Sequence, residues 1–271
     1  MHDRLMLGKY YPGKSIMHRL DPRTKLILLI LLMVTLLIPK TILPILLLFI
    51  GSVGLIIISK IPLKEILSSL RSIMFILVFA FLINLFSGKG PIILDLGILK
   101  ITQDGLLNAI LMSVRLILLV IDTTLFLTLT TTPLQLSHAL ENLLKPLSVI
   151  RFPAHEIAMM MSIALRFVPT LFEETDKIMK AQSSRGANYD VGGFFNKIKG
   201  YISIIVPLFI SCFRRADELA NAMEARCYHG GKGRTKLNEL RYTTLDLLFS
   251  LIFIICCVII LFTHYQMPNL I

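Results

Sequence analysis

Long uncharged apolar stretches recur along the chain, and their lengths predict membrane-spanning helices. An α-helix rises ~1.5 Å per residue, so roughly 20 mostly apolar residues are needed to cross ~30 Å of hydrocarbon. The first stretch is shorter than this and would rely on flanking Arg23 and Lys25, or on a tilted, incomplete span. We therefore expect an all-α integral membrane protein with about five transmembrane helices. The expected spans are residues 26–39, 41–59, 72–88, 106–132 and 247–263.

The segment between the fourth and fifth spans is too polar to cross a membrane, yet it keeps apolar residues at helical spacing. It predicts one short helix followed by two long ones. Each long helix has an apolar first half and a charged second half, which is typical of a helix that starts against a bilayer and emerges into the cytoplasm. The expected helices are residues 133–145, 153–186 and 196–230, with kinks at Pro169 and Pro207 and a stop at Gly230.

This pattern divides the chain into three parts. Residues 1–132 form a membrane domain with four spans, residues 133–244 form a cytoplasmic domain of long helices, and residues 245–271 form the closing span and an outer C-terminus. Residues 87–105, between the third and fourth spans, have glycine and proline around short β-like runs and predict a small hairpin. No cleavable signal peptide is expected, because the basic lead before the first span is too long and no Ala-x-Ala site follows it.

Composition excludes an ordinary soluble domain, since 55% of the residues are hydrophobic and only 17% are charged. The net charge of +11 would suit a nucleic-acid-binding protein, but its distribution points elsewhere. With five spans, most of the Lys and Arg residues fall on one side of the membrane, and only Lys40, Lys89 and Lys100 fall on the other. This bias predicts a plasma-membrane protein with a cytoplasmic N-terminus and an outer C-terminus, and no nucleic-acid partner. The four cysteines form no Cys-x-x-Cys pair, so neither a metal site nor a disulfide is expected.

The ends of the two long helices repeat each other, because FEETDKIMKAQSSRGA (172–187) aligns with FRRADELANAMEARCY (213–228). Arg185 and Arg226 coincide in this alignment, here called the helix-end repeat. An arginine near a helix C-terminus interacts with the macrodipole for ~0.3–1 kcal/mol, which explains one arginine well but two in matched frames poorly. Two equivalent guanidinium groups suggest two equivalent acceptors, each a carboxylate-lined pocket on a soluble partner.

In these residues the chain resembles the transmembrane (T) component of energy-coupling factor (ECF) transporters. In that family two cytoplasmic coupling helices each end in an Ala-Arg-Gly signature. Here the signatures read Ser184-Arg185-Gly186 and Ala225-Arg226-Cys227, so Cys227 replaces a glycine and the turn after Arg226 does not follow from the signature alone. Residues 8–26, with a Pro-Gly turn and a Leu-Asp-Pro-Arg-x-Lys lead into the first span, also resemble the start of the family. The resemblance extends over essentially the whole chain.

The resemblance implies a non-catalytic scaffold for vitamin or transition-metal uptake. Each signature would dock into one of two ABC-type ATPase subunits, which would bind ATP and Mg²⁺, so that this chain needs no cofactor. The apolar halves of the long helices would hold a separate substrate-binding (S) membrane subunit, and adaptable methionines suit such a surface. The residues expected at this contact are Met159, Met160, Met161, Pro169, Ile205 and Pro207.

Two other kinds of chemistry compete with this interpretation. The Gly-Gly-Lys-Gly-Arg-Thr stretch, residues 230–235, lacks P-loop spacing and follows a helix instead of opening one, so the chain is not expected to bind ATP itself. We interpret this stretch as a connector whose charges lie beside anionic membrane lipid.

Arg115 and Asp122 lie about two helical turns apart on one face of the fourth expected span, and charges inside a membrane are functional candidates. A secondary transporter or membrane enzyme that uses these two residues is therefore the alternative. No metal-ligand or Ser/His/Asp cluster accompanies them, which favours a structural interhelical polar pair. The repeat also lies in the cytoplasmic helices and not in two membrane halves, which favours a coupling device.

Overall fold

The computed structural model describes residues 10–39, 41–88, 90–95, 100–146, 153–187, 194–230 and 242–266. These residues fall into two compact units, and the boundary between the units lies inside one helix, between Ala139 and Leu140. The first unit, called the membrane unit, contains the residues before this boundary and the last helix. The second, called the long-helix unit, contains the residues between this boundary and Gly230.

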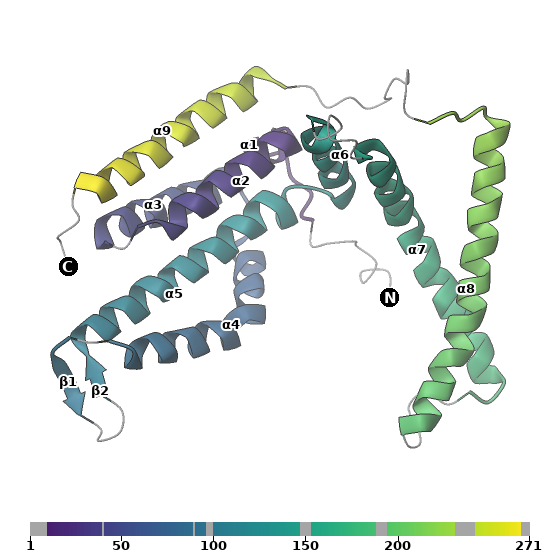
Figure 1. Ribbon diagram of the computed structural model, residues 1–271, viewed down its shortest axis with the longest axis horizontal. Helices are drawn as coiled ribbons and strands as arrows, with labels where there is room; N and C mark the ends of the chain where they lie inside the picture. Colours follow the sequence, from purple (N-terminus) through teal and green to yellow (C-terminus); the bar gives the residue numbers. More distant parts are fainter. Residues whose placement is uncertain are drawn as a thin grey trace. The chain divides into compact units, whose positions relative to one another are not determined.

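The membrane unit is helical apart from one small hairpin (Figure 1). Its strands β1 and β2 pair antiparallel, with Ile92 opposite Thr102, in the segment where the sequence predicts a hairpin. The Thr102 side chain then accepts a hydrogen bond from the Gly105 N–H and caps the following helix. The elements of this unit are α1 (Ile16–Arg19), α2 (Pro22–Leu37), α3 (Ile42–Ser59), α4 (Leu63–Phe86), β1 (Ile92–Asp95), β2 (Lys100–Thr102), α5 (Gln103–Thr123), the π-helix η2 (Thr124–Leu129), the start of α6 (Pro133–Leu144) and α9 (Thr244–Gln266).

Three helical runs among the described residues are long and apolar enough to cross a membrane: α3, the continuous run Gln103–Leu129, and α9. A fourth is obtained if α4, which bends by 62° between Leu63–Arg71 and Ile73–Phe86, counts as one span. Helix α2 has 16 residues and is ~24 Å long, which is shorter than the hydrocarbon layer. The all-α membrane class is confirmed, whereas the expected count of five spans is not.

The core of the membrane unit lies where α2, α3, the α5–η2 run and α9 meet. On α2 the buried leucines recur at intervals of four positions, so one face of the helix packs inward while the opposite face stays exposed. An edge-on contact between Phe126 and Phe253, with ring centroids 6.0 Å apart, joins η2 to α9. The largest fully buried apolar side chains are Phe126, Met17, Leu36, Leu118, Leu125 and Leu129.

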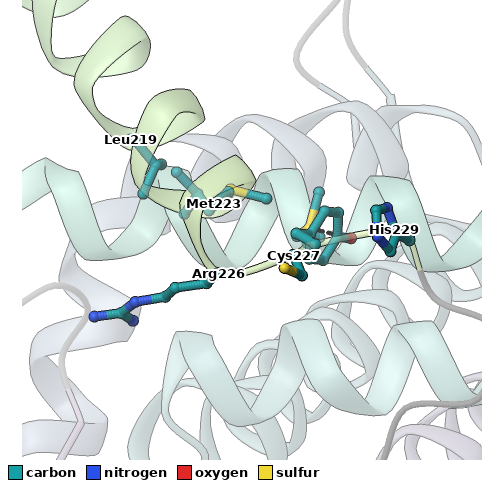
Figure 2. Close-up of a pocket in the computed structure, with 9 residues that line it drawn as sticks. Leu219, Met223, Arg226, Cys227 and His229 are labelled. Carbon is teal, nitrogen blue, oxygen red and sulfur yellow. Dashed lines mark hydrogen bonds between the residues drawn. The ribbon is translucent and has the colours of Figure 1, made fainter.

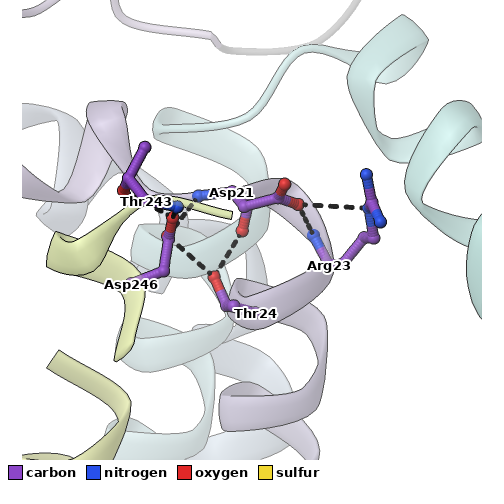
Figure 3. A network of polar contacts seen from close by, with 5 residues as sticks. All are labelled: Asp21, Arg23, Thr24, Thr243 and Asp246. Atoms are coloured by element: carbon purple, nitrogen blue, oxygen red, sulfur yellow. Dashed lines mark hydrogen bonds and ion pairs between the residues drawn. The ribbon is translucent and has the colours of Figure 1, made fainter. Parts of the chain in front are cut away.

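A buried polar junction ties the start of α2 to the start of α9 (Figure 3). Asp21 is the N-cap of α2, and its carboxylate accepts a hydrogen bond of 2.9 Å from the Arg23 N–H. The Asp246 carboxylate accepts bonds from the Asp21 N–H at 2.7 Å and from the Thr24 hydroxyl at 3.3 Å. It also accepts from the N–H and hydroxyl of Thr243, at 2.8 and 2.7 Å. One carboxylate thus satisfies donors from two helix starts that lie 225 residues apart.

Lys25 closes the other end of this junction. Its side chain is 1% exposed, and the ammonium group donates to the Thr130 carbonyl at 2.9 Å and faces the hydroxyls of Thr130 and Thr131 at 3.4 and 3.3 Å. These residues follow the last turn of η2, where carbonyl groups have no partner within the helix. The Leu-Asp-Pro-Arg-x-Lys lead therefore has a structural role, because it holds together the ends of three helices.

Candidate functional site: two arginine-bearing helix ends

The long-helix unit contains α7 (Ala154–Ser184) and α8 (Phe194–Ala225), which have 31 and 32 residues and are each roughly 46–48 Å long. Each helix continues through its proline, Pro169 or Pro207, as a single element. The two helices run in opposite directions and cross (Figure 1). Their contacts show this direction, because Glu174 lies beside Arg215, while Met159, earlier on α7, contacts Tyr228, later in the chain.

Helix α7 ends in a Schellman turn with Arg185 at the C-cap position. The Gly186 N–H donates to the Ser183 carbonyl at 3.0 Å, and the Ala187 N–H donates to the Gln182 carbonyl at 2.9 Å. Gly186 has a φ of +87°, the left-handed conformation that this motif needs after the C-cap. The first signature therefore forms the end of the helix, and the arginine stands at its last position.

Helix α8 ends in the same turn, although a cysteine replaces the glycine. The Cys227 N–H donates to the Glu224 carbonyl at 2.8 Å, and the Tyr228 N–H donates to the Met223 carbonyl at 3.1 Å. Cys227 has a φ of +53°, which costs a residue with a Cβ atom roughly 1–2 kcal/mol. This turn also ends the helix at Ala225, so the expectation that α8 continues to Gly230 is wrong. The repeat in sequence is thus a repeat in backbone geometry.

Both arginine side chains are exposed. Among the described residues, no hydrogen bond or ion pair involves the guanidinium group of Arg185 or Arg226. The helix C-terminus already favours a cation, but its carbonyls are satisfied by the turn itself. Each guanidinium group can therefore offer its full set of donors to a carboxylate on another molecule.

A change at the glycine position of each turn should affect the two helix ends in opposite ways. Cys227→Gly removes the strain of a left-handed cysteine and is expected to stabilise the end of α8 by up to about 1 kcal/mol. Gly186→Ala introduces that strain at the end of α7, where no neighbouring atom would contact the new Cβ atom. Hydrogen exchange at the amides of Ala187 and Tyr228 measures both effects. Equal exchange rates in each variant and its parent would contradict the strain assigned to Cys227.

A pocket of about 480 Å³ lies beside Arg226, between the first half of α7 and the end of α8 (Figure 2). The guanidinium group of Arg226 points away from Cys227 and His229, so the pocket and the charge face different directions. The Tyr228 hydroxyl contacts the Met159 sulfur at 2.9 Å and joins the turn to α7. The pocket is lined by Met159, Ile163, Leu219, Met223 and residues 226–230.

The antiparallel crossing separates residues that the sequence groups together. Met159 lies in the pocket beside Arg226, whereas its neighbours Met160 and Met161 are 57% and 39% exposed. On α8, Ile205 is 58% exposed and belongs to an apolar stripe, here called the α8 stripe, whose members recur every three to four positions. Pro169 and Pro207 are half-buried. The α8 stripe consists of Ile198, Tyr201, Ile202, Ile205, Phe209 and Phe213.

Arg115 and Asp122 do not contact each other, and each contacts a different segment of the membrane unit. The Arg115 guanidinium donates to the Pro39 carbonyl, at the end of α2. The Asp122 carboxylate is fully buried and accepts a hydrogen bond of 2.8 Å from the Ser52 hydroxyl of α3. Their separation of about two helical turns, or ~10 Å, is too long for a direct contact along one helix. Each residue joins α5 to a different neighbour.

One contact that the sequence interpretation missed joins the two long helices where they cross. The Arg215 guanidinium donates to the Glu174 carboxylate at 2.9 Å. These residues occupy matched positions of the helix-end repeat and carry opposite charges, so the alignment contained a signal for the contact. The glycine- and lysine-rich stretch interpreted as a connector lies outside the described residues from residue 231 onward.

Fold and site together define an all-α integral membrane protein that presents two equivalent arginine-bearing helix ends. The family model CbiQ, described as a cobalt transport protein, matches residues 13–237. The energy-coupling factor transporter transmembrane protein EcfT of Ruminiclostridium cellulolyticum is 52% identical over 246 residues, covering 91% of this chain and 92% of the relative. The protein of the same name from Bacillus subtilis is 45% identical over 247 residues, covering 91% and 93%. That from Acidaminococcus fermentans is 42% identical over 272 residues, covering 97% and 98%.

The chain belongs to the CbiQ family, that is, to the transmembrane components of energy-coupling factor transporters. It is therefore a transporter subunit in a membrane, and the secondary transporter or membrane enzyme built on Arg115 and Asp122 is not favoured.

Proposed function

We propose that this chain is the scaffold and coupling subunit of an ATP-driven ECF-type importer. Arg185 and Arg226 dock into two ABC-type ATPase subunits, which bind ATP and Mg²⁺ and carry out hydrolysis. The chain itself catalyses no reaction. The motion of the ATPases passes along α7 and α8 to a substrate-binding membrane subunit.

The observation that carries this proposal is the structural equivalence of the two arginine-bearing helix ends. Arg185 follows Glu174 by as many positions as Arg226 follows Arg215, about three helical turns, so each arginine lies ~16 Å beyond the crossing. Because the helices run in opposite directions, the two ends can be up to ~33 Å apart. One pocket on one partner cannot reach across that distance, whereas two similar ATPase subunits offer two similar pockets.

The α8 stripe supports the second contact, with the substrate-binding subunit. Phe209 and Phe213 pack edge to face with centroids 4.6 Å apart, and both rings remain more than half exposed. Exposed aromatic and aliphatic residues in one continuous stripe mark a docking surface for an apolar partner. Met160 on α7 adds a deformable side chain that suits partners of differing shape.

The charge distribution supports an orientation with the N-terminus and the long helices in the cytoplasm and the C-terminus outside the plasma membrane. The substrate, a vitamin or a transition-metal ion, would bind in the separate subunit, so no pocket for it is needed in this chain.

Co-purification tests the proposal. The full chain is extracted from its native membrane in a mild detergent, and each associated chain is identified by mass spectrometry. Two ATPase subunits together with a small membrane protein are expected. Transport by the chain reconstituted alone would overturn the proposal.

A charge placed on the apolar surface should release the substrate-binding subunit and leave the ATPases bound. Met160→Asp and Ile205→Asp each require a carboxylate to lose its hydration at an apolar contact, which costs several kcal/mol. The amount of each subunit that co-purifies with the variant measures the effect. Met179→Asp, at an exposed methionine in the charged half of α7, is the control and should retain the substrate-binding subunit. Loss of the ATPases with retention of the membrane partner would reverse the two assignments.

A further inference from the structure

The crossing of α7 and α8 contains a half-buried ion pair whose two carboxylate oxygens are both occupied. One oxygen of Glu174 accepts from the Arg215 guanidinium at 2.9 Å, and the other faces the Ser211 hydroxyl at 3.4 Å. The side chains of Glu174 and Arg215 are 24% and 32% exposed, and Ser211 is buried. Ser211 therefore places a small buried side chain beside the point where the charges meet. The pair is thus part of the helix–helix contact and not a solvated surface bridge.

The two residues of the ion pair occupy equivalent positions in the helix-end repeat. Glu174 and Arg215 are the same position of the two copies, so the two helices touch each other at equivalent points. Both docking arginines therefore lie equally far along the chain from the contact. A shift of α8 along its own axis by a single turn, ~5.4 Å, would change the distance from the crossing to Arg226 and leave the distance from the crossing to Arg185 unchanged, so the two arginines would no longer be symmetric. Apolar contacts fix the register of two packed helices less strictly than a directed pair of charges does.

We infer that the Glu174–Arg215 ion pair is a positioning element that fixes the register of the crossing and so holds the two docking arginines in symmetric positions for two ATPase subunits. The symmetric placement of the arginines for two ATPase subunits rests on the proposed function. The register of α7 against α8 can be measured without any transport substrate. Neither residue contacts a docking partner in this role; both act through the position of Arg185 and Arg226.

The neighbouring residues provide a matched control. Glu173 and Arg214 are also equivalent positions of the repeat, with the same two charges in the same order. Both are exposed, and neither is recorded in a hydrogen bond or ion pair among the described residues. A change of charge at these positions alters the net charge of each helix by the same amount without touching the crossing.

The test is the distance between spin labels at Lys180 and Asn221, which are equivalent, exposed positions between the crossing and the two arginines. The labels are carried by genetically encoded amino acids in the full chain co-purified with its ATPases, so that the native cysteines stay in place. Glu174→Arg and Arg215→Glu each oppose like charges at the crossing and should broaden the distance distribution or shift its mean by about one helical turn, ~5 Å. The double variant Glu174→Arg/Arg215→Glu restores opposite charges and should recover the parent distribution. Glu173→Arg and Arg214→Glu should leave it unchanged.

Three outcomes would overturn the inference. The single variants could keep the parent's distance distribution, the double variant could fail to recover it, or the control variants could broaden it as much as the single variants do. Thermal unfolding of each variant separates a shift of register from a loss of fold, since the restored double variant must unfold like the parent. A failure of the proposed function gives a different result, because then no ATPase subunits co-purify even with the parent chain.

Discussion

Replacement of both Arg185 and Arg226 by alanine is expected to release the ATPase subunits from the purified complex and to abolish ATP-driven uptake. Truncation of one partner in a buried, charge-assisted pair typically costs ~2–5 kcal/mol, because a carboxylate is left unpaired. Each single variant should therefore weaken ATPase association by about 30-fold or more, since ~1.4 kcal/mol is a factor of ten. Quantitative pull-down of the ATPases by the tagged chain measures the loss.

Lys180→Ala provides the control for this prediction, because it removes an exposed cation from the same helix, shortly before Arg185. It should retain both ATPases. If Arg185→Ala and Arg226→Ala each support ATP-coupled uptake at the parent rate, the arginines only interact with their helix dipoles.

Replacement of Asp246 by alanine is expected to destabilise the membrane unit. The carboxylate is 2% exposed and is the only acceptor recorded in the described residues for the N–H groups of Asp21 and Thr243. Its removal leaves the buried N–H of Asp21 unsatisfied, at ~1–3 kcal/mol, whereas Thr243 is exposed and its donors can bond to solvent. We expect a total loss of about 1–3 kcal/mol and a lower yield of folded protein. Thermal unfolding in detergent measures the loss.

Asp104→Ala is the matched control, because Asp104 also lies in the first turn of a long apolar helix but is recorded in no hydrogen bond among the described residues. It should unfold within a few degrees of the parent chain. An Asp246→Ala variant that unfolds at the same temperature as Asp104→Ala would show that the junction contributes little to stability.

Features encoded by neighbouring residues could be predicted from the sequence. The apolar stretches located the long helices, the glycines and prolines located the hairpin, and the helix-end repeat located the two arginine-bearing ends. The polar junctions could not be located in this way. Asp246 binds a residue 225 positions away, and Lys25 binds one 105 positions away, so no local pattern reports either contact.

The same distinction explains what local patterns missed or misplaced. Periodicity placed Arg115 and Asp122 on one face of a helix, but periodicity does not reveal which other segment covers each turn of that face. Glycine was expected to end α8, whereas Cys227 adopts the left-handed conformation before any glycine is reached. The opposite directions of α7 and α8 place Met159 beside Arg226, which a separate view of each helix could not show.

The crossing divides each of the two long helices into two arms of unequal length. Beyond the ion pair, each helix continues for about three turns to its arginine, whereas roughly five and a half turns of the same helix precede the pair. A rigid helix that turns about the crossing therefore acts as a lever with a mechanical advantage of about one half, because helix length is proportional to residue number. A movement of ~3 Å imposed at an arginine would displace the far, apolar end of the same helix by ~6 Å. Under the proposed function, this geometry would exchange force at the docking arginines for travel at the apolar ends of the helices.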